Sequence, residues 1–527
     1  MKSRGITAAT YVFFAAFLLV GLLVFRDYGI SWDEIPTRRF GIMYVDNMVP
    51  DAAALDSVRA AGGPAYERFG PLFEILLVRT ERALQPIDIR TTFFVRHLLT
   101  FLVFFVGVLC FNALCRRRFR PGIALLATVF LAASPQLFAH AFYNVKDISF
   151  LTMFVATILT LDSVLLRPEW RTMLMHVLTT LLLLGTRVLG GFAMVLTGLA
   201  ALARRPAWRT LGLLVAYGVC VAVLLPLVWP VLQIDYFGIV RDAVAGSTSN
   251  PYRSTNLFRG QVYQASDLPR DYVPTWMLVT TPPVITLLFL AGTISALADF
   301  IKRPRDYVSG DRQRDLIVLA WFFLPVVGCM VLRPVLYDGW RHLFFVYPAL
   351  VYIAALGMER IRDFAVARAG ESRAALTNAA LAGAVMLCLA PALVFMARNH
   401  PFEHLYYNRF AGSDMKAVRQ RFETDYWGLT YRPSLEYIMH TDRSPHVRIF
   451  VATYPGRLNV AMLEPDDRAR VEIVGSEGEA DYVVTSYRYH PQDYPFPREV
   501  FAVRVGDASM GSVFDVRALP PSATPRQ

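Results

Sequence analysis

The sequence is poor in charged residues. Only 18% of its 527 residues are Asp, Glu, Lys or Arg, whereas an ordinary soluble domain carries about 25%. Hydrophobic residues make up 55%, which excludes a purely soluble protein. The 37 Phe, 24 Tyr and 8 Trp also exclude a disordered chain, because they supply more apolar surface than a solvated chain carries. We therefore interpret the chain as a polytopic membrane protein.

Cysteine and nucleotide-binding motifs are scarce or missing. The five cysteines all lie within apolar runs, so no disulfide framework or cysteine-based zinc site is expected in the loops. The sequence contains no Walker loop, no G-x-G-x-x-G, no H-E-x-x-H and no repeat with a period of about 20 to 50 residues. ATP-driven transport is therefore not expected. The formal charge of +11 is spread over short clusters between apolar runs, which argues against a nucleic-acid partner.

Apolar runs that can cross a bilayer are abundant. About 20 residues in a helix span the roughly 30 Å of hydrocarbon, and we count about eleven such runs. They fall at residues 9–25, 92–115, 121–140, 148–166, 172–185, 188–203, 211–232, 275–301, 316–336, 343–358 and 379–396. The first run lacks an A-x-A cleavage site, so we interpret it as an uncleaved anchor.

Basic residues predict the orientation of these runs. Every second loop is rich in arginine, and such loops face the cytoplasm; they cover residues 116–120, 167–171, 204–209, 302–314 and 360–373. This alternation puts the N-terminus inside, and it holds only if the stretch 172–203 is split near Arg187. An odd number of spans then puts the C-terminal tail on the extracytoplasmic side.

The composition divides the chain into two parts. Residues 1–397 form the membrane part, and its long first outer loop (26–92) contains a segment, 66–84, with apolar residues at helical spacing. This pattern predicts amphipathic helices along the membrane surface, with an ordinary packed helix as the alternative. The tail, 398–527, is predicted to be a soluble extracytoplasmic α/β domain. Its expected strands are 446–453, 470–474, 480–486 and 498–505, and a helical pattern covers 415–439.

Two outer loops carry candidate acids and bases. Asp33 and Glu34 follow Trp32 shortly after the first run, and Lys146 and Asp147 stand where a later run begins. A solvated loop beside interfacial aromatics would explain the first pair. A snorkelling lysine and a helix-N-terminal acid would explain the second.

Arginines at membrane depth form a second group of candidates. Arg187 lies at the predicted hairpin tip, and Arg341-His342 precedes another apolar run. Buried ionisable groups in a membrane usually face a polar cavity, which favours function, although interfacial anchoring is the alternative for Arg341. Arg333 is interpreted as the structural partner of an acid such as Asp162. A similar structural role is expected for Arg96 and His97. The predicted topology puts the candidates on one side of the membrane: Asp33, Glu34, Lys146, Asp147, Arg187 and Arg341.

Short motifs in this order resemble the GT-C superfamily of membrane glycosyltransferases. They are SWDE (Asp33-Glu34), NVKD (Lys146-Asp147) and DGWRHLFFVYP, which contains Arg341, followed by PFEHLYYNRF and FETDYWGLTYRPSLEYI in the tail. Within the superfamily, the chain resembles bacterial members of glycosyltransferase family 39, the protein O-mannosyltransferase-like group. The resemblance covers roughly residues 1–437.

The resemblance implies an activity in cell-envelope glycosylation, and the membrane it implies is the bacterial cytoplasmic (inner) membrane. A hexose or pentose would pass from a polyprenyl-phosphate carrier to a lipid, glycan or protein acceptor outside, with inversion. Asp33 would be the catalytic base, and Glu34 would orient it or help to hold a cation. The donor phosphate would be bound by Arg341 first, with Lys146, Arg187 and His342 beside it.

Metal dependence and the outer loop 233–274 are left open. Some superfamily members use Mg²⁺ or Mn²⁺, for which Asp147 and Glu34 are the candidate ligands, and others use no metal; neither motif here contains a carboxylate-x-carboxylate triplet. Tyr252, Arg253, Asn256 and Arg259 could form a mobile lid.

Two other functions fit parts of the sequence. A transporter or flippase of lipid-linked saccharides would also need intramembrane arginines, but related halves are expected of it and we find none. A membrane-anchored scaffold whose tail binds a partner would explain the tail, but it would not explain the polar groups at the outer surface.

Overall fold

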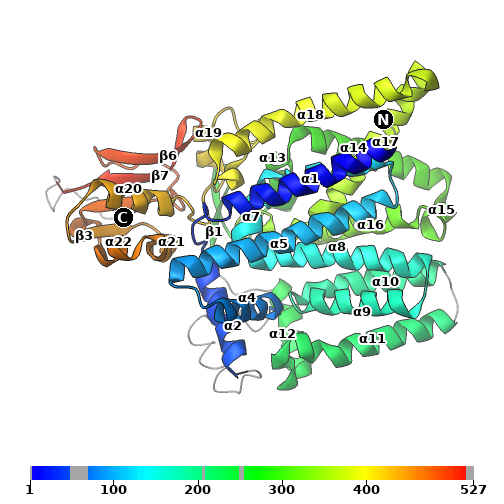
Figure 1. Ribbon diagram of the computed structural model, residues 1–527, viewed down its shortest axis with the longest axis horizontal. Helices are drawn as coiled ribbons and strands as arrows, with labels where there is room; N and C mark the ends of the chain where they lie inside the picture. The colour runs from blue at the N-terminus through cyan, green and yellow to red at the C-terminus, as the bar shows by residue number, and fades with distance from the viewer. Residues whose placement is uncertain (1–2, 48–68, 205–207, 249–253, 518–527) are drawn as a thin grey trace.

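The computed structural model describes residues 3–47, 69–204, 208–248 and 254–517. A long helical bundle carries a small sheet-containing domain at one end, and the start of the first helix lies at the other end (Figure 1). The chain thus has two opposite poles. The sheet domain marks the pole at which the candidate site lies.

Eight helical segments of the described chain are long and apolar enough to cross a membrane. They are α1 (Ser3–Val24), α5 (Ile89–Arg116), α8 (Val145–Leu166), α11 (Trp208–Val228), α14 (Pro283–Lys302), α16 (Gln313–Leu332), α17 (Tyr347–Ala369, preceded by a 3-10 turn, Arg341–Val346) and α18 (Ala374–Asn399). Their composition makes this a multi-span membrane protein.

The remaining predicted runs are also helical but shorter or broken. α6 (Pro121–Ala132) and α7 (Pro135–Tyr143) are bent by 59° and count as a ninth span if taken together. The break falls at Pro135, which has no N–H to continue the helix. α9 (Trp170–Leu184) and α10 (Gly191–Arg204) are shorter apolar helices. Their separation confirms the split near Arg187. The run 275–301 is interrupted at Pro282-Pro283, which separates α13 (Tyr272–Thr280) from α14.

Ion pairs join the arginine-rich loops at the pole opposite the sheet domain. Arg118, after α5, lies 3.0 Å from Asp315 at the start of α16 and 2.8 Å from Glu359 on α17. Asp162, near the end of α8, contacts Arg117 at 2.8 Å and Arg314 at 2.5 Å. Two of the loops expected to share the cytoplasmic side, 116–120 and 302–314, therefore meet in space beside the ends of α8 and α17.

The predicted pair between Arg333 and Asp162 is wrong. Arg333 follows the last residue of α16 and donates to the carbonyl of Leu268 at 3.3 Å. Asp162 is bound at the first turn of α16 instead. A helix of this length spans about 30 Å, so the two residues lie at opposite poles.

In its described residues, the first outer loop forms two helices that pack near α5. They are α2 (Glu34–Asn47) and α4 (Leu72–Leu84), whereas the beginning of the predicted segment, residues 66–68, falls outside the described residues. The fully buried Arg96 of α5 lies 2.6 Å from both Glu74 and Glu81 of α4. Its predicted structural role is confirmed, because the pair fastens α4 to the bundle.

The C-terminal domain contains a mixed sheet of five strands in the order β4-β3-β5-β7-β6. β3 is parallel to β4 and β5, and the contacts of β7 with β5 and β6 are antiparallel. The strands are β3 (Val447–Val451), β4 (Val471–Ile473), β5 (Tyr482–Thr485), β6 (Glu499–Val505) and β7 (Ala508–Asp515). The first, second, third and fourth of these correspond to the predicted strands. β7 was not predicted, because Gly511 and two serines interrupt its apolar alternation.

The helical pattern predicted over 415–439 is two helices. α19 (Met415–Arg421) and α20 (Tyr431–Thr441) are separated by a loop, residues 422–430. This loop enters the functional site. The smaller elements are α12 (Tyr236–Thr248), the hairpin β1 (Thr255–Phe258) and β2 (Gln261–Gln264), α15 (Pro304–Val308), α21 (Tyr454–Asn459) and α22 (Pro465–Ala469).

Candidate active site

Asp33 meets two of the predicted cations. One carboxylate oxygen of Asp33, Oδ2, lies 3.0 Å from Lys146 Nζ and 3.9 Å from Arg341 Nη1. The side chain keeps about a quarter of its surface exposed, at 25%. Asp33 is therefore the accessible acid of the cluster.

Asp147 is held by the start of α8. Asn144 caps this helix: its side-chain oxygen accepts from the Asp147 amide at 3.2 Å, and its amide group donates to Asp147 Oδ2 at 2.7 Å. The first turn of a helix favours a negative charge. The Asp147 carboxylate also contacts Arg187, and Arg341 Nη1 lies 3.3 Å away.

Arg187 is positioned by the first outer loop. Phe69 forms an antiparallel bridge with Arg187, and the amide of Gly70 donates to the Thr186 carbonyl at 3.1 Å. A Cβ at position 70 would lie 2.1 Å from the Gly185 carbonyl oxygen, so only glycine permits this approach. The hairpin tip between α9 and α10 is thus clamped beneath the loop that follows Asp33.

Arg341 lies at the centre of the cluster. Besides Asp33 and Asp147, it contacts Asp338, whose Oδ2 is 3.3 Å from Arg341 Nη2. The guanidinium carbon lies 4.8 Å from the ring centroid of Tyr337 and 5.0 Å from that of Trp427, which adds cation–π attraction. The turn that carries it has Asp338 at φ 58° and Gly339 at φ 71°.

The electrostatics of Asp33 follow from these contacts. Burial alone would raise the pKa of its carboxyl group. The ammonium group of Lys146 and the guanidinium of Arg341 outweigh burial, so that the pKa of Asp33 lies below its usual range. Asp33 is consequently ionised at neutral pH.

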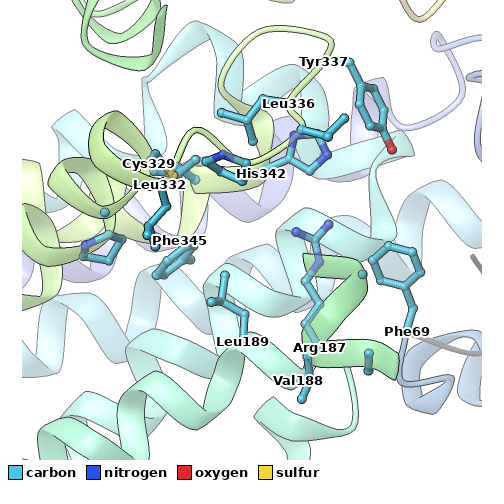
Figure 2. Close-up of a pocket in the computed structure, with 17 residues that line it drawn as sticks. Phe69, Arg187, Val188, Leu189, Cys329, Leu332, Leu336, Tyr337, His342 and Phe345 are labelled. Atoms are coloured by element: carbon cyan, nitrogen blue, oxygen red, sulfur yellow. The ribbon is translucent and has the colours of Figure 1, made fainter. Parts of the chain in front are cut away.

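An apolar cavity of ≈ 290 Å³ adjoins this cluster. Figure 2 shows the Arg187 side chain extending between Phe69 and Leu189 toward the segment that carries Tyr337 and His342. His342 lines the cavity, its ring lies edge-on to Tyr337 at 4.8 Å, and its buried Nδ1 has no hydrogen-bond partner among the described residues. The remaining wall is mostly aliphatic and comes from the 3-10 turn before α10 (Val188–Gly190), from α12, from α16 and from the segment before α17. The cavity therefore joins an apolar volume to a cationic end.

Glu34 points away from the cluster. It is buried, one carboxylate oxygen lies 3.0 Å from His97 Nε2, and the other accepts from the Ser31 amide at 2.7 Å. Glu34 opens α2, and neighbouring residues of a helix project about 100° apart. It is therefore separated from Asp33, and its predicted place beside the base is not supported.

The residues present do not fit a divalent cation. Asp147 is already bound by two guanidinium groups, and Glu34 is bound to His97. Within the ranges that the structure describes, no three His, Cys, Asp or Glu side chains are grouped to hold a metal. The expected ligands Asp147 and Glu34 are therefore not brought together in this arrangement, because guanidinium groups contact the Asp147 carboxylate and His97 contacts Glu34.

The described part of the outer loop 233–274 supports the site. Tyr252 and Arg253 lie outside the described residues. Asn256 is fully buried, donates to the Leu336 carbonyl at 3.4 Å and accepts from the Asp338 amide at 3.2 Å. Arg259 pairs with Asp271 at 2.6 Å. The described part of the loop thus fastens the turn that carries Asp338.

Three further residues of the cluster were missed from the sequence. They are Asp338, Trp427 and Arg488, of which the last lies 2.6 Å from Asp338. Asp338 could have been noticed, because it stands in the DGWRH motif. Trp427 and Arg488 belong to the C-terminal domain, and only the fold brings them to Arg341.

Comparison with known proteins identifies the fold. No family model matches this chain, and no curated protein matches it. Among solved structures, ArnT from Cupriavidus metallidurans bound to undecaprenyl phosphate is similar with a TM-score of 0.50 and 13% identity, covering 97% of this chain and 98% of that chain. The apo oligosaccharyltransferase of Archaeoglobus fulgidus has a TM-score of 0.47 and 12% identity, over 91% and 71% of the two chains.

The likeness to ArnT shows the fold and nothing finer, because the identity is low. The protein is a multi-span membrane protein of GT-C fold with a C-terminal sheet domain. The expected fold class is confirmed.

Proposed function

We propose that this protein is a glycosyltransferase that moves a sugar from a polyprenyl-phosphate carrier to an acceptor hydroxyl on the extracytoplasmic side. One observation carries the proposal: an apolar cavity ends at a cluster of cations beside one accessible carboxylate. The GT-C fold, shared with a protein crystallised with undecaprenyl phosphate, supports it. The sugar would be a hexose or pentose, and the SWDE, NVKD and GWRH motifs favour glycosyltransferase family 39.

The cavity fits a lipid phosphate in two ways. Its aliphatic wall would bury isoprenoid surface, which stabilises a complex by about 25 cal/mol per Å². Arg187 and His342 line the cavity. Arg341 is linked to Arg187 by their shared partner Asp147, and Lys146 is linked to Arg341 by their shared partner Asp33. A fork-shaped guanidinium is suited to phosphate oxygens.

The chemistry follows from the charges. The acceptor oxygen attacks the anomeric carbon of the donor sugar, its proton passes to Asp33, and the bond from that carbon to the phosphate oxygen breaks. The lipid phosphate leaves with one more negative charge than it had in the donor. Fixed cations act most strongly on charge that develops in this way, and one well-placed donor contributes about 3 to 4 kcal/mol. Attack from the face opposite the phosphate inverts the configuration at the anomeric carbon.

The orientation is part of the proposal. We place residues 1–397, with the N-terminus inside, in the bacterial cytoplasmic membrane as the catalytic part, and residues 398–527 outside. The meeting of the basic loops at one pole supports this arrangement, because cytoplasmic loops are enriched in Lys and Arg.

Turnover of labelled donor by the purified protein in nanodiscs tests the activity. A panel of polyprenyl-phosphate sugars is supplied with membrane extract as the source of acceptor, and release of the lipid phosphate is measured. Asp33→Asn should keep lipid binding and lose turnover by about 10²- to 10⁴-fold. Arg341→Ala should lower donor use by about 10²- to 10³-fold while the protein still inserts and folds.

Matched controls are Asp46→Asn and Arg241→Ala, whose exposed side chains pair with Arg82 and Asp242, outside the cluster. Both should retain wild-type turnover. Undiminished sugar transfer by Asp33→Asn would defeat the assignment of the base. Lipid-linked saccharide crossing vesicle membranes without any sugar transfer would favour the flippase.

A further inference from the structure

Arg341 is surrounded by more negative charge than it can balance. Asp147 and Asp338 each lie 3.3 Å from its guanidinium, and Asp33 lies 3.9 Å away. Arg341 itself is almost fully buried. A single buried cation among three carboxylates would leave no attraction for an incoming phosphate.

Each of the three carboxylates has a second cation. Lys146 contacts Asp33, Arg187 contacts Asp147, and Arg488 lies 2.6 Å from Asp338. These cations come from three different parts of the chain: the start of α8, the hairpin tip before α10 and the C-terminal domain. Arg488 therefore occupies the same place in the network as the two residues assigned to the donor phosphate above.

Arg488 is built into this place. Its side chain is 3% exposed, it donates to the Tyr426 carbonyl, and its guanidinium carbon lies 4.7 Å from the ring centroid of Trp32. Tyr487 and Tyr489 on either side have φ angles of 59° and 66°. Non-glycine residues rarely adopt this left-handed region, and it persists where surrounding structure imposes it. The backbone bends so that Arg488 leaves its own domain and enters the cluster.

The charge count gives Arg488 a specific consequence. The ion-paired groups of the network are four cations and three carboxylates, which leaves one positive charge in excess. Without Arg488 the excess disappears. A polyprenyl-phosphate sugar carries one negative charge, and the departing lipid phosphate carries up to two. The excess charge therefore matches what the donor brings.

We propose that Arg488 is a positioning residue of the donor-phosphate site, inserted by the C-terminal domain to neutralise Asp338 so that Arg341 keeps its charge for the lipid phosphate. This inference rests on the proposed function. It also gives the C-terminal domain a role, because docking of that domain completes the site. Arg488 acts through Asp338 and Arg341 and needs no contact with the donor.

Four variants and a control separate this role from general damage. Arg488→Ala leaves Asp338 to compete for Arg341, so the Kd for undecaprenyl phosphate and the KM for donor should both rise by roughly 10- to 100-fold. Saturating turnover should change much less. In Arg488→Ala/Asp338→Asn the excess charge is restored, so both constants should return to within about threefold of wild type. Asp338→Asn alone should bind undecaprenyl phosphate no more weakly than wild type.

Arg488→Lys keeps the charge but loses the fork, so its constants should fall between those of wild type and Arg488→Ala. Arg448→Ala removes an arginine of the same domain from a surface pair with Asp481, and it should bind as wild type does. Binding of undecaprenyl phosphate is measured by native mass spectrometry on the full-length protein in nanodiscs. Near-UV circular dichroism and the apparent melting temperature monitor folding.

Two results would overturn the inference. One is an unchanged Kd for undecaprenyl phosphate in Arg488→Ala; the other is a double variant that binds as weakly as Arg488→Ala, which would make Arg488 merely structural. If Arg488→Ala does not fold, Arg488→Lys and the double variant decide by the same criterion. A wild-type protein that binds undecaprenyl phosphate but consumes no donor would refute the proposed activity, and the binding comparison would still decide the role of Arg488.

Discussion

At the scale of single residues, Glu423 is a buried acid beside the ion pair of Arg488 and Asp338. It lies in the loop between α19 and α20, buried near Arg488 and Asp338, and one of its carboxylate oxygens has no hydrogen-bond partner among the described residues. Burial raises the pKa of Glu423 to about 8. The negative charge of Asp338 also raises this pKa, whereas the positive charge of Arg488 lowers it. A protonated Glu423 does not compete with Asp338 for the positive charge of Arg488.

Stability should depend on pH through Glu423. The folded pKa of about 8 exceeds the unfolded value of about 4.3, so the folded protein binds the proton more tightly. This contribution to stability is fully present below the unfolded pKa, declines as the pH rises and is lost once the pH has passed the folded pKa. Within that window it changes by about 1.4 kcal/mol per pH unit.

The apparent melting temperature of wild type and Glu423→Gln, measured between pH 5 and pH 9, checks this. Glu423→Gln should flatten the decline toward alkaline pH, whereas the exposed Glu371→Gln should leave it unchanged. Parallel curves for wild type and Glu423→Gln would show that Glu423 is ionised in the folded protein.

At the scale of elements, buried ion pairs determine how the first outer loop packs. α4 presents Glu74 and Glu81 to Arg96 on α5, and Arg38 on α2 approaches Glu81 at 2.8 Å. The two outer helices are therefore joined to one membrane helix. Because Phe69 and Gly70 immediately precede α4, this packing also positions the hairpin that carries Arg187.

Removing the central cation should destabilise this unit strongly. Arg96→Met leaves two buried carboxylates without their partner, and loss of one member of a buried pair costs about 3 to 5 kcal/mol. Arg82→Met on α4 breaks an exposed pair with Asp46, for which about 0 to 1 kcal/mol is expected. Apparent melting temperatures and protease sensitivity of α4 compare the two. Equal effects would show that the buried pairs do not fasten the loop.

At the scale of the whole molecule, the two poles differ in structure. Ion pairs between basic loops close one pole, and the C-terminal domain, the outer loops and the ends of the membrane helices build the site at the other. Figure 1 shows the sheet domain at the pole that the end of α1 reaches. The acceptor is therefore expected to approach from the side of the sheet domain.

Labelling in cells checks which pole is outside. In a variant without native cysteines, Ser476→Cys lies in the C-terminal domain and Ser309→Cys lies between α15 and α16, and both serines are exposed. A membrane-impermeant maleimide should label Ser476→Cys in intact spheroplasts and Ser309→Cys only after permeabilisation. The reverse pattern would place the proposed site on the cytoplasmic side and refute the proposal that the reaction is extracytoplasmic.

Much of the membrane part was predictable from the sequence because the bilayer imposes it. A spanning segment must satisfy its own backbone, so apolar length alone identifies α5, α8 and α16. Arginine-rich loops predicted the common pole, and the cost of charge at membrane depth singled out Arg187 and Arg341.

The same local reasoning failed where a partner was distant in the chain. It paired Arg333 with Asp162 because both are charges within apolar runs, although the helix places them at opposite poles. It also grouped Glu34 with Asp33, although helix geometry turns Glu34 to His97. The position of two neighbouring residues in a sequence does not show in which direction each side chain projects where a helix begins.

The amino-acid sequence by itself determined the membrane class, the apolar helices, four of the five strands of the tail sheet and most of the charged residues of the candidate site, since these depend on hydropathy and local periodicity. Only the tertiary structure decided which charges meet. Arg488 and Trp427 reach Arg341 from a separate domain, and such contacts depend on docking between elements, for which neighbouring residues carry no periodic signal.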